Sequence, residues 1–164
     1  MIVIGIDPGL PGAIGVIGHR AEFLYLQDIP TITRQGKKAH VERQVNGAAL
    51  ADIVREYMKN YDRNEIHAFI EMPIAFPGLH IAAVGASFHT AGVIEGVIGA
   101  LHIAHTLVRP TDWKKVLKLG RDKEQARAMA VRLFPEASEY LSRKKDHNRA
   151  EAMLLAKYGH GLVA

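Results

Sequence analysis

Cysteine is absent from this 164-residue sequence. Its absence excludes disulfide bridges, thiol nucleophiles and thiolate metal sites, and it fits a reducing compartment. No uninterrupted apolar run reaches the roughly 18 residues that a membrane-spanning helix needs. Met1 leads directly into a strand pattern, without the segments typical of a signal or transit peptide. We therefore expect a cytoplasmic protein that makes no membrane contact.

The composition that remains is that of an ordinary globular domain. Hydrophobic residues make up 48% of the chain and charged residues 23%, and the length suits one domain over residues 1–164 with a substantial core. The formal charge is +4 and the isoelectric point is about 9.4. This mild excess of basic residues favours a polyanionic partner such as nucleic acid without requiring one.

The first residues predict a buried strand that ends on an acid. Residues 2–6 are mostly β-branched and apolar, Asp7 follows them, and Pro8-Gly9 is a turn signal. A second apolar stretch over residues 13–17 completes a hairpin that directs the Asp7 carboxylate beyond the sheet. Burial penalises the charge of a carboxylate unless a cation meets it, so Asp7 is a candidate functional residue. The alternative is a turn in which Asp7 caps its own backbone.

Further along, strand and helix patterns alternate. We expect strands over residues 22–27, 66–70 and 102–108, a loop over 28–40, and helices over 41–61, 81–101, 109–117, 124–133 and 148–158, the last ended by Gly159 and Gly161. This order predicts an α/β fold with a mixed central sheet. The helix over 81–101 is rich in glycine and alanine. Each glycine costs a helix about 1 kcal/mol, so this composition indicates close approach to a neighbouring element or subunit.

Acidic residues recur where the predicted elements meet. A second strand ends on Glu71, and in the last helix Glu151 falls on or beside the apolar stripe. His147 lies one turn before Glu151, and Asp146 lies at the start of that helix. An alternative reading of the same residues is a capping box formed by Asn148 and Glu151, which requires no chemistry.

Carboxylates that share one site repel one another, so their convergence implies a divalent cation. Oxygen ligands with at most one imidazole select Mg²⁺ or Mn²⁺ over zinc. Two such ions ~4 Å apart are the usual arrangement for hydrolysing a phosphodiester. The residues predicted to form this metal site are Asp7, Glu71, Asp146, His147 and Glu151.

Several segments occur in an order that carries a family resemblance. They are residues 4–9 (Ile-Gly-Ile-Asp-Pro-Gly), Ile70-Glu71, the glycine-rich residues 91–96, and residues 146–152 with their acids. Three further segments are 110–114 (Pro-Thr-Asp-Trp-Lys), Asp122-Lys123 and Phe134-Pro135. Together they resemble the RuvC family of Holliday-junction resolvases, and most of all its phage-type members. The likeness spans essentially the whole chain.

The resemblance implies an RNase H-like α/β fold, with a mixed five-stranded central sheet flanked by helices. It also implies a homodimer that resolves four-way (Holliday) DNA junctions and related branched DNA by paired symmetric nicks, in recombination and repair. The expected cofactor is Mg²⁺, two ions per active site, with Mn²⁺ as a substitute. The expected location is the cytoplasm of a bacterium or of a phage-infected host cell.

The resemblance further implies roles for individual acids. Those that match the family's metal ligands are Asp7, Glu71 and Glu151. Asn148 is nearest to the position of the remaining family acid. Because asparagine is a poor metal ligand, we favour Asp146 for that role, with His147 as a possible ligand.

Basic and aromatic residues receive roles by the same resemblance. Lys114 and Lys123 resemble basic residues beside the scissile phosphate, and Phe76 resembles an aromatic residue that stacks at the junction centre. The other residues expected to contact DNA are Arg34, Lys37, Lys38, Arg121, Lys144 and Lys145. The lone tryptophan, Trp113, we expect in the core.

Two other functions stay open. A strand, an Asp-x-Gly turn and a second strand also begin the actin-like phosphotransferases, where the turn holds nucleotide phosphates. Such enzymes need a second domain and a second phosphate loop, for which the chain leaves no room. The other alternative is a protein that binds junctions on the same scaffold without cutting them.

Overall fold

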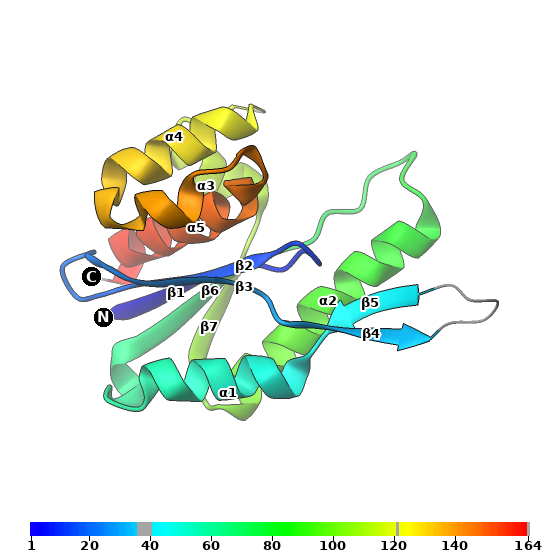
Figure 1. Cartoon of the computed structure of the whole chain (residues 1–164), viewed down its shortest axis with the longest axis horizontal. Helices are drawn as coiled ribbons and strands as arrows, with labels where there is room; N and C mark the ends of the chain where they lie inside the picture. The colour runs from blue at the N-terminus through cyan, green and yellow to red at the C-terminus, as the bar shows by residue number, and fades with distance from the viewer. Residues whose placement is uncertain (36–40, 121, 164) are drawn as a thin grey trace.

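The computed structural model describes residues 1–35, 41–120 and 122–163, so the predicted DNA-binding residues Lys37, Lys38 and Arg121 lie outside the described part. Its centre is a five-stranded mixed sheet in the order β3-β2-β1-β6-β7 (Figure 1). The strands are β1 (Ile2–Asp7), β2 (Ala13–Ile17), β3 (Phe23–Asp28), β6 (Ile66–Glu71) and β7 (Ala104–Val108). The expected mixed five-stranded sheet is confirmed.

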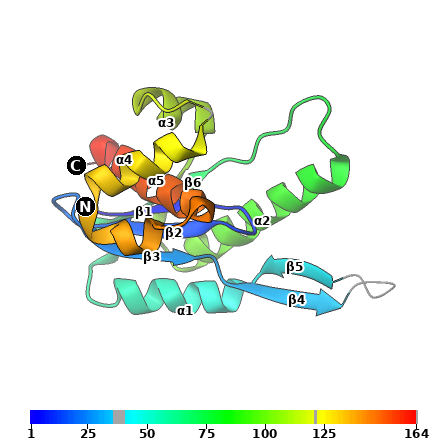
Figure 2. The same cartoon turned by 45° about the horizontal axis from the view of Figure 1, so that its top comes forward.

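Helices cover both faces of this sheet. One face carries α1 (Gly47–Met58) and α2 (Ile81–Ala100), and the other carries α3 (Pro110–Val116), α4 (Lys123–Leu133) and α5 (His147–Val163) (Figures 1 and 2). Three short 3₁₀ turns lie in the connections. They are η2 (Arg63–Glu65), between α1 and β6, and η3 (Pro135–Leu141) and η4 (Lys144–Asp146), between α4 and α5. In both views α5 lies directly on the sheet, with α4 outside it.

The two-residue period of β1 decides which side chains reach which helices. Ile2, Ile4 and Ile6 belong to the core that includes residues of α1 and α2. Val3 belongs to the core on the α5 side. Alternation therefore places Asp7, at the end of β1, on the face that α5 covers.

Glycines let α5 approach the sheet closely. A Cβ built on Gly5 of β1 would collide with the backbone oxygen of Ala152, and one built on Gly159 would collide with the ring of Phe69 in β6. The expectation that Gly159 and Gly161 end the last helix is wrong, since α5 runs to Val163. Gly159 is needed inside the helix because only a hydrogen fits between α5 and Phe69.

A hairpin stands where the sequence predicted a loop and the first turns of a helix. Strands β4 (Thr31–Gln35) and β5 (Val41–Val45) pair antiparallel and project beyond the central sheet beside α2 (Figures 1 and 2). Helix α1 begins at Gly47 because the Asn46 side chain accepts a hydrogen bond from the Ala49 N–H at 3.1 Å. Helical spacing of apolar residues up to Val45 was therefore misleading. The predicted DNA-binding residue Arg34 lies in β4.

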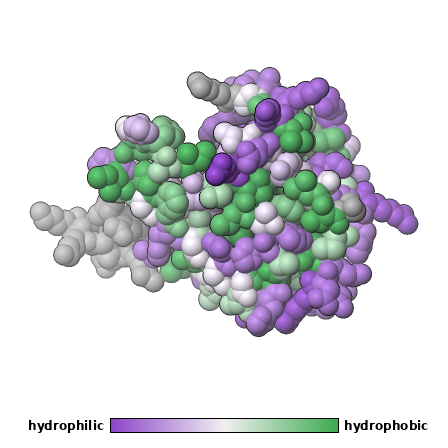
Figure 3. Space-filling view, turned by 180° about the vertical axis from the view of Figure 1, so that it is seen from behind, coloured by the Kyte–Doolittle hydropathy of each residue, from purple (hydrophilic) through white to green (hydrophobic). Residues whose placement is uncertain are grey.

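Helix α2 leaves most of its apolar surface uncovered. Its buried residues are Thr90, Ala91, Ile94 and Ile98, whereas Ile81 is 87% and Phe88 48% exposed. Figure 3 shows apolar side chains at the surface on the face seen from behind. By length and composition alone, α2 is also apolar enough to cross a membrane. The search for uninterrupted apolar runs did not identify it, because polar residues are scattered along the helix. A single helix of this kind is weak evidence for a membrane span. An exposed apolar surface on a helix also suits a protein partner.

Two glycines of α5 provide a matched test of the close packing. Gly159→Ala should lower the free energy of unfolding by about 1–3 kcal/mol, because the added methyl group must displace Phe69 or the helix. Gly161→Ala meets no described atom within 4 Å and should raise that free energy by up to ~1 kcal/mol through helix propensity. Urea denaturation of both variants measures the difference. Equal stability of the two would contradict the contact between Gly159 and Phe69.

Candidate active site

Two carboxylates lie at adjacent strand ends. β1 and β6 are parallel, and Ile6 pairs with Ile70, so Asp7 and Glu71 follow side by side. Both residues are half-buried. Glu71 is two residues after Phe69, which packs on α5, so alternation places Glu71 on the same face as Asp7.

Helix α5 brings a third carboxylate to this edge of the sheet. Glu151 directly precedes Ala152, whose backbone oxygen lies so close to Gly5 that a Cβ there would collide with it. Burial, and then the charges of Glu71 and Glu151, raise the pKa of Asp7 from its usual value near 3.8 to about 7. Burial also raises the pKa of Glu71. The structure therefore brings Asp7, Glu71 and Glu151 together, within electrostatic reach of one another.

Helix α3 supplies the counter-charge and a fixed hydrogen-bond donor. Lys114 Nζ lies 2.9 Å from Glu151 Oε1, and its charge partly offsets the raised pKa values of Asp7 and Glu71. Trp113 Nε1 donates a hydrogen bond of 2.7 Å to Glu71 Oε2. Trp113 is fully buried, which confirms its expected place in the core. Its bond to Glu71 was missed, and the only sequence signal for it is its position beside Lys114.

Asp146 is not brought to these carboxylates. Its side chain accepts hydrogen bonds from the backbone N–H of Arg143 at 2.8 Å and from the Arg143 guanidinium, and Arg149 lies 3.9 Å away. Burial alone would raise the pKa of Asp146, but the bonds from Arg143 outweigh burial and hold it below its usual value. Asp146 thus closes the turn η4 and pairs with arginines, so the geometry gives no support to its predicted role as a metal ligand.

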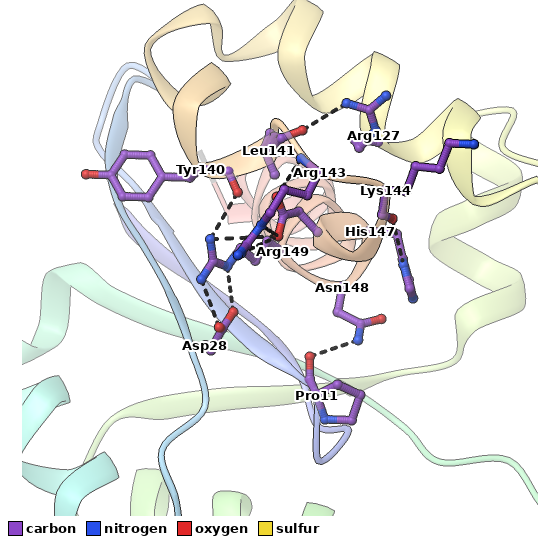
Figure 4. Close-up of polar contacts among 11 residues, drawn as sticks. Pro11, Asp28, Arg127, Tyr140, Leu141, Arg143, Lys144, His147, Asn148 and Arg149 are labelled. Atoms are coloured by element: carbon purple, nitrogen blue, oxygen red, sulfur yellow. Dashed lines mark hydrogen bonds and ion pairs between the residues drawn. The ribbon is translucent and has the colours of Figure 1, made fainter.

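The first turn of α5 is tied to neighbouring elements, and Figure 4 shows its bonds to Pro11 and Asp28. Asn148 Nδ2 donates to the Pro11 carbonyl in the turn after β1, at 2.8 Å. The Arg149 guanidinium donates to the Asp28 carboxylate at the end of β3. The predicted capping box of Asn148 and Glu151 is not formed, because both side chains bond elsewhere. Instead, Asn148 fastens the turn that follows Asp7 to the helix that carries Glu151.

His147, which the sequence predicted as a metal ligand, contacts a lysine of α4. His147 Nε2 lies 2.9 Å from Lys123 Nζ, at the start of α4. Lys123 lines a cavity of about 230 Å³ together with Lys114, Glu151, Leu119, Gly120, Asp122 and Ala126. The two lysines predicted to act at the phosphate therefore share one cavity beside Glu151, while His147 bonds one of them.

The predicted DNA-contacting residues that are described lie at the surface. Phe76, in the loop after Glu71, is 59% exposed. Lys144 and Lys145 are exposed in η4, directly before α5. Phe76 follows Glu71 on the loop after β6, and the two lysines precede the helix that carries Glu151.

The donor set suits a hard divalent cation. Oxygen atoms of Asp7, Glu71 and Glu151 are ligands that Mg²⁺ and Mn²⁺ prefer, and they sit on two strands and one helix. Among the described residues, no group of three or more carboxylate or imidazole side chains is already arranged to hold an ion. The Lys114 ammonium, bonded to Glu151, provides the counter-charge instead. The chemistry of these residues therefore fits a metal ion. Lys114 would compete with such an ion for Glu151.

Comparison with solved structures defines the fold. A Thermus thermophilus RuvC in complex with a Holliday junction substrate superposes with a TM-score of 0.58 at 15% sequence identity, over 99% of this chain and 96% of that chain. The chain has the RuvC fold. A second Thermus thermophilus RuvC structure gives a TM-score of 0.51 at 12% identity, over 99% of this chain and 97% of that one. The resemblance to RuvC that the sequence motifs indicate is thus confirmed at the level of the fold.

Sequence comparison gives a shorter match. A segment of 98 residues, 58% of this chain, is 29% identical to the chloroplastic Holliday junction resolvase MOC1 of Chlamydomonas reinhardtii. The match spans 11% of the length of that protein. No protein-family model matches the chain.

The raised pKa of Asp7 predicts an effect on stability. The folded protein holds the Asp7 proton up to about pH 7 and the unfolded chain only up to about pH 4, so the folded state loses stability as pH rises through this window. One pKa unit corresponds to about 1.4 kcal/mol. In EDTA, Asp7→Asn should therefore raise the free energy of unfolding by ~1–3 kcal/mol at pH 8 and little at pH 4.

Urea denaturation at the two pH values measures this difference. The matched control is Asp52→Asn, on the exposed side of α1. An Asp7→Asn variant that is less stable than wild type at pH 8 would contradict the repulsion among the three carboxylates.

Proposed function

We propose that residues 1–164 form one nuclease domain that depends on divalent metal ions and resolves four-way DNA junctions by paired nicks. The observation that carries the proposal is the convergence of Asp7, Glu71 and Glu151 beside Lys114 on the RuvC fold. The substrate follows from the relatives, since one RuvC is solved with a Holliday junction and MOC1 is named a Holliday junction resolvase. The resemblance of the sequence motifs to phage-type members of the family supports a cytoplasmic location, in a bacterium or a phage-infected host.

Each group of the site has a part in this chemistry. Asp7, Glu71 and Glu151 would hold two Mg²⁺ ions, for which Mn²⁺ substitutes, and these would supply an activated water and charge for the leaving oxygen. Trp113 fixes the orientation of Glu71 by its bond to Oε2. Lys114 and Lys123 face the shared cavity, where they would stabilise the negative charge that grows on the attacked phosphate.

The surface around the site would position the DNA. Exposed Lys144 and Lys145 add charge for backbone phosphates, and Arg34, Lys37, Lys38 and Arg121 are proposed to extend that contact. Phe76 is aromatic, exposed and on the loop that follows Glu71, so it is placed to stack on an unpaired base. These contacts would orient the junction without taking part in the chemistry.

A protein that binds junctions without cutting them is the second candidate. It would have no use for three mutually repelling carboxylates, whose burial costs stability unless a cation offsets it. Addition of Mg²⁺ to junctions already bound in EDTA separates the two functions, because only the nuclease produces nicks.

The test of the nuclease proposal compares two Asp→Asn variants on junction, replication fork, flap and duplex DNA. Asp7→Asn should abolish Mg²⁺-dependent nicking and leave junction binding in EDTA equal or stronger, since it removes a negative charge and little surface. Asp52→Asn, exposed on α1, should nick as wild type does. Gel assays of nicking and of binding give both quantities. Normal nicking by Asp7→Asn, or Mg²⁺-independent nicking by wild type, would contradict the assignment.

We further propose that α2 forms the contact of a homodimer. Gly92 and Gly96 lie about 200° around the helix from the buried Ile94, so they face away from the core. A Cβ at Gly85, Gly92 or Gly96 would meet no described atom within 4 Å. Packing within the described chain therefore does not explain these glycines. A second copy approaching α2 closely would explain both the glycines and the exposed Phe88.

Substitution of one of these glycines tests the dimer. Gly96→Leu should leave the fold intact, because the side chain points into open space, but should block close approach of a second α2. Sedimentation should then show a monomer, and junction cleavage should yield single nicks in place of paired ones. The matched control is Gly161→Leu on α5, which also meets no described atom. A Gly96→Leu variant that sediments as a dimer would place the interface elsewhere.

A further inference from the structure

Among the described residues, the side chain of Lys123 has one polar partner, and it is an imidazole. Lys123 is exposed at the start of α4, and its Nζ lies 2.9 Å from His147 Nε2. The neighbouring acid Glu124 bonds Arg127 at 2.7 Å. An imidazole acceptor, unlike a carboxylate, carries no negative charge to neutralise the Lys123 ammonium, and it limits where the amine can go.

The imidazole is itself held in one orientation. His147 Nδ1 lies 3.3 Å from the backbone oxygen of Lys144 (Figure 4). A carbonyl oxygen can only accept, so Nδ1 carries the proton and Nε2 presents a lone pair. That lone pair meets the Lys123 ammonium, which can only donate. The two contacts are therefore chemically consistent, with the imidazole donating from Nδ1 and accepting at Nε2.

The helix that bears His147 is also fixed with respect to the carboxylates. Asn148 and Arg149, the next two residues, bond the turn after β1 and the end of β3. Glu151 lies one turn further along, at a spacing of four residues from His147. His147, the acceptor for Lys123, is thus part of the helical turn that Asn148 and Arg149 hold in place. Lys123 and Glu151 both line the 230 Å³ cavity.

We propose that His147 is a positioning residue for Lys123, and not the metal ligand that the sequence suggested. It holds the amine of Lys123 over the cavity beside Glu151, where an attacked phosphate would lie, without neutralising its charge. The proposal rests on the proposed nuclease function for its consequence, but the contact between the two side chains is independent of that function.

A double-mutant cycle measures the consequence. His147→Ala should slow single-turnover nicking at saturating protein by roughly 2- to 10-fold, the effect of losing one orienting hydrogen bond, with little change in junction binding. In a Lys123→Ala background the same substitution should have no further effect, because the amine that it positions is gone. His147→Gln retains an acceptor and should restore most of the rate. The Mg²⁺ dependence of the rate should be unchanged throughout.

A metal ligand at His147 gives different results, which would overturn the proposal. His147→Ala would then slow nicking equally with and without Lys123, and it would raise the Mg²⁺ concentration needed for half-maximal rate. Failure of His147→Gln to exceed His147→Ala in rate, with both variants melting as wild type does, would also count against positioning.

A measurement without DNA or metal separates this inference from the nuclease proposal. Lysines are converted to ¹³C-dimethyl-lysine, which keeps the charge and one N–H donor, and the signal of position 123 is assigned with Lys123→Arg. In EDTA this signal should be displaced from those of free surface lysines in wild type and in His147→Gln. It should move to the free position in His147→Ala. A wild-type signal already at the free position would refute the contact, whether or not the protein proves to be a nuclease.

Discussion

Mutual repulsion among Asp7, Glu71 and Glu151 is the constraint on which the rest of the structure depends. Burial and like charge together raise the pKa of Asp7 to about 7. Two of the acids are fixed by the parallel pairing of β1 with β6, which is set by the hydrophobic core of the sheet. The third must be held against them by a helix, so the packing of α5 decides whether the site exists.

The packing of α5 combines close backbone contact with specific polar ties. Gly5 and Gly159 remove the side chains that would otherwise separate helix and sheet. Asn148 and Arg149 then fix the rotation and the axial position of the first turn, because one bonds the turn after β1 and the other the end of β3. Apolar contact alone tolerates small shifts of a helix along a sheet, whereas two directional bonds at one end do not. Glu151 is therefore placed by the same turn that these bonds immobilise.

The sequence predicted those parts of the site that local patterns determine. A buried strand ending on Asp7, and a second ending on Glu71, follow from hydrophobic periodicity, and parallel neighbours bring such ends together. Asp146 could not be judged in this way, because its main partner, Arg143, precedes a 3₁₀ turn that has no apolar period. Helix α5 was predicted too short, since the reason for Gly159 inside it is the ring of Phe69 on another element. The β4–β5 hairpin was missed because few of its residues are apolar, so alternation gave a weak signal.

The negative charge of the three carboxylates can be offset by a proton on Asp7, by the Lys114 ammonium or by a bound cation. Near neutral pH, Asp7 is partly protonated and Glu151 is paired with Lys114, so part of the negative charge of the three acids is already offset. Carboxylates bind divalent ions only when ionised, so the proposed cation binding at these acids would be coupled to proton release from Asp7. It would also be coupled to release of Lys114 from Glu151. Lys114 lines the cavity that also contains Lys123, so the amine freed from Glu151 stays beside the position proposed for the phosphate. In the proposed nuclease, the same lysine would pair with Glu151 in the metal-free protein and remain available for the chemistry.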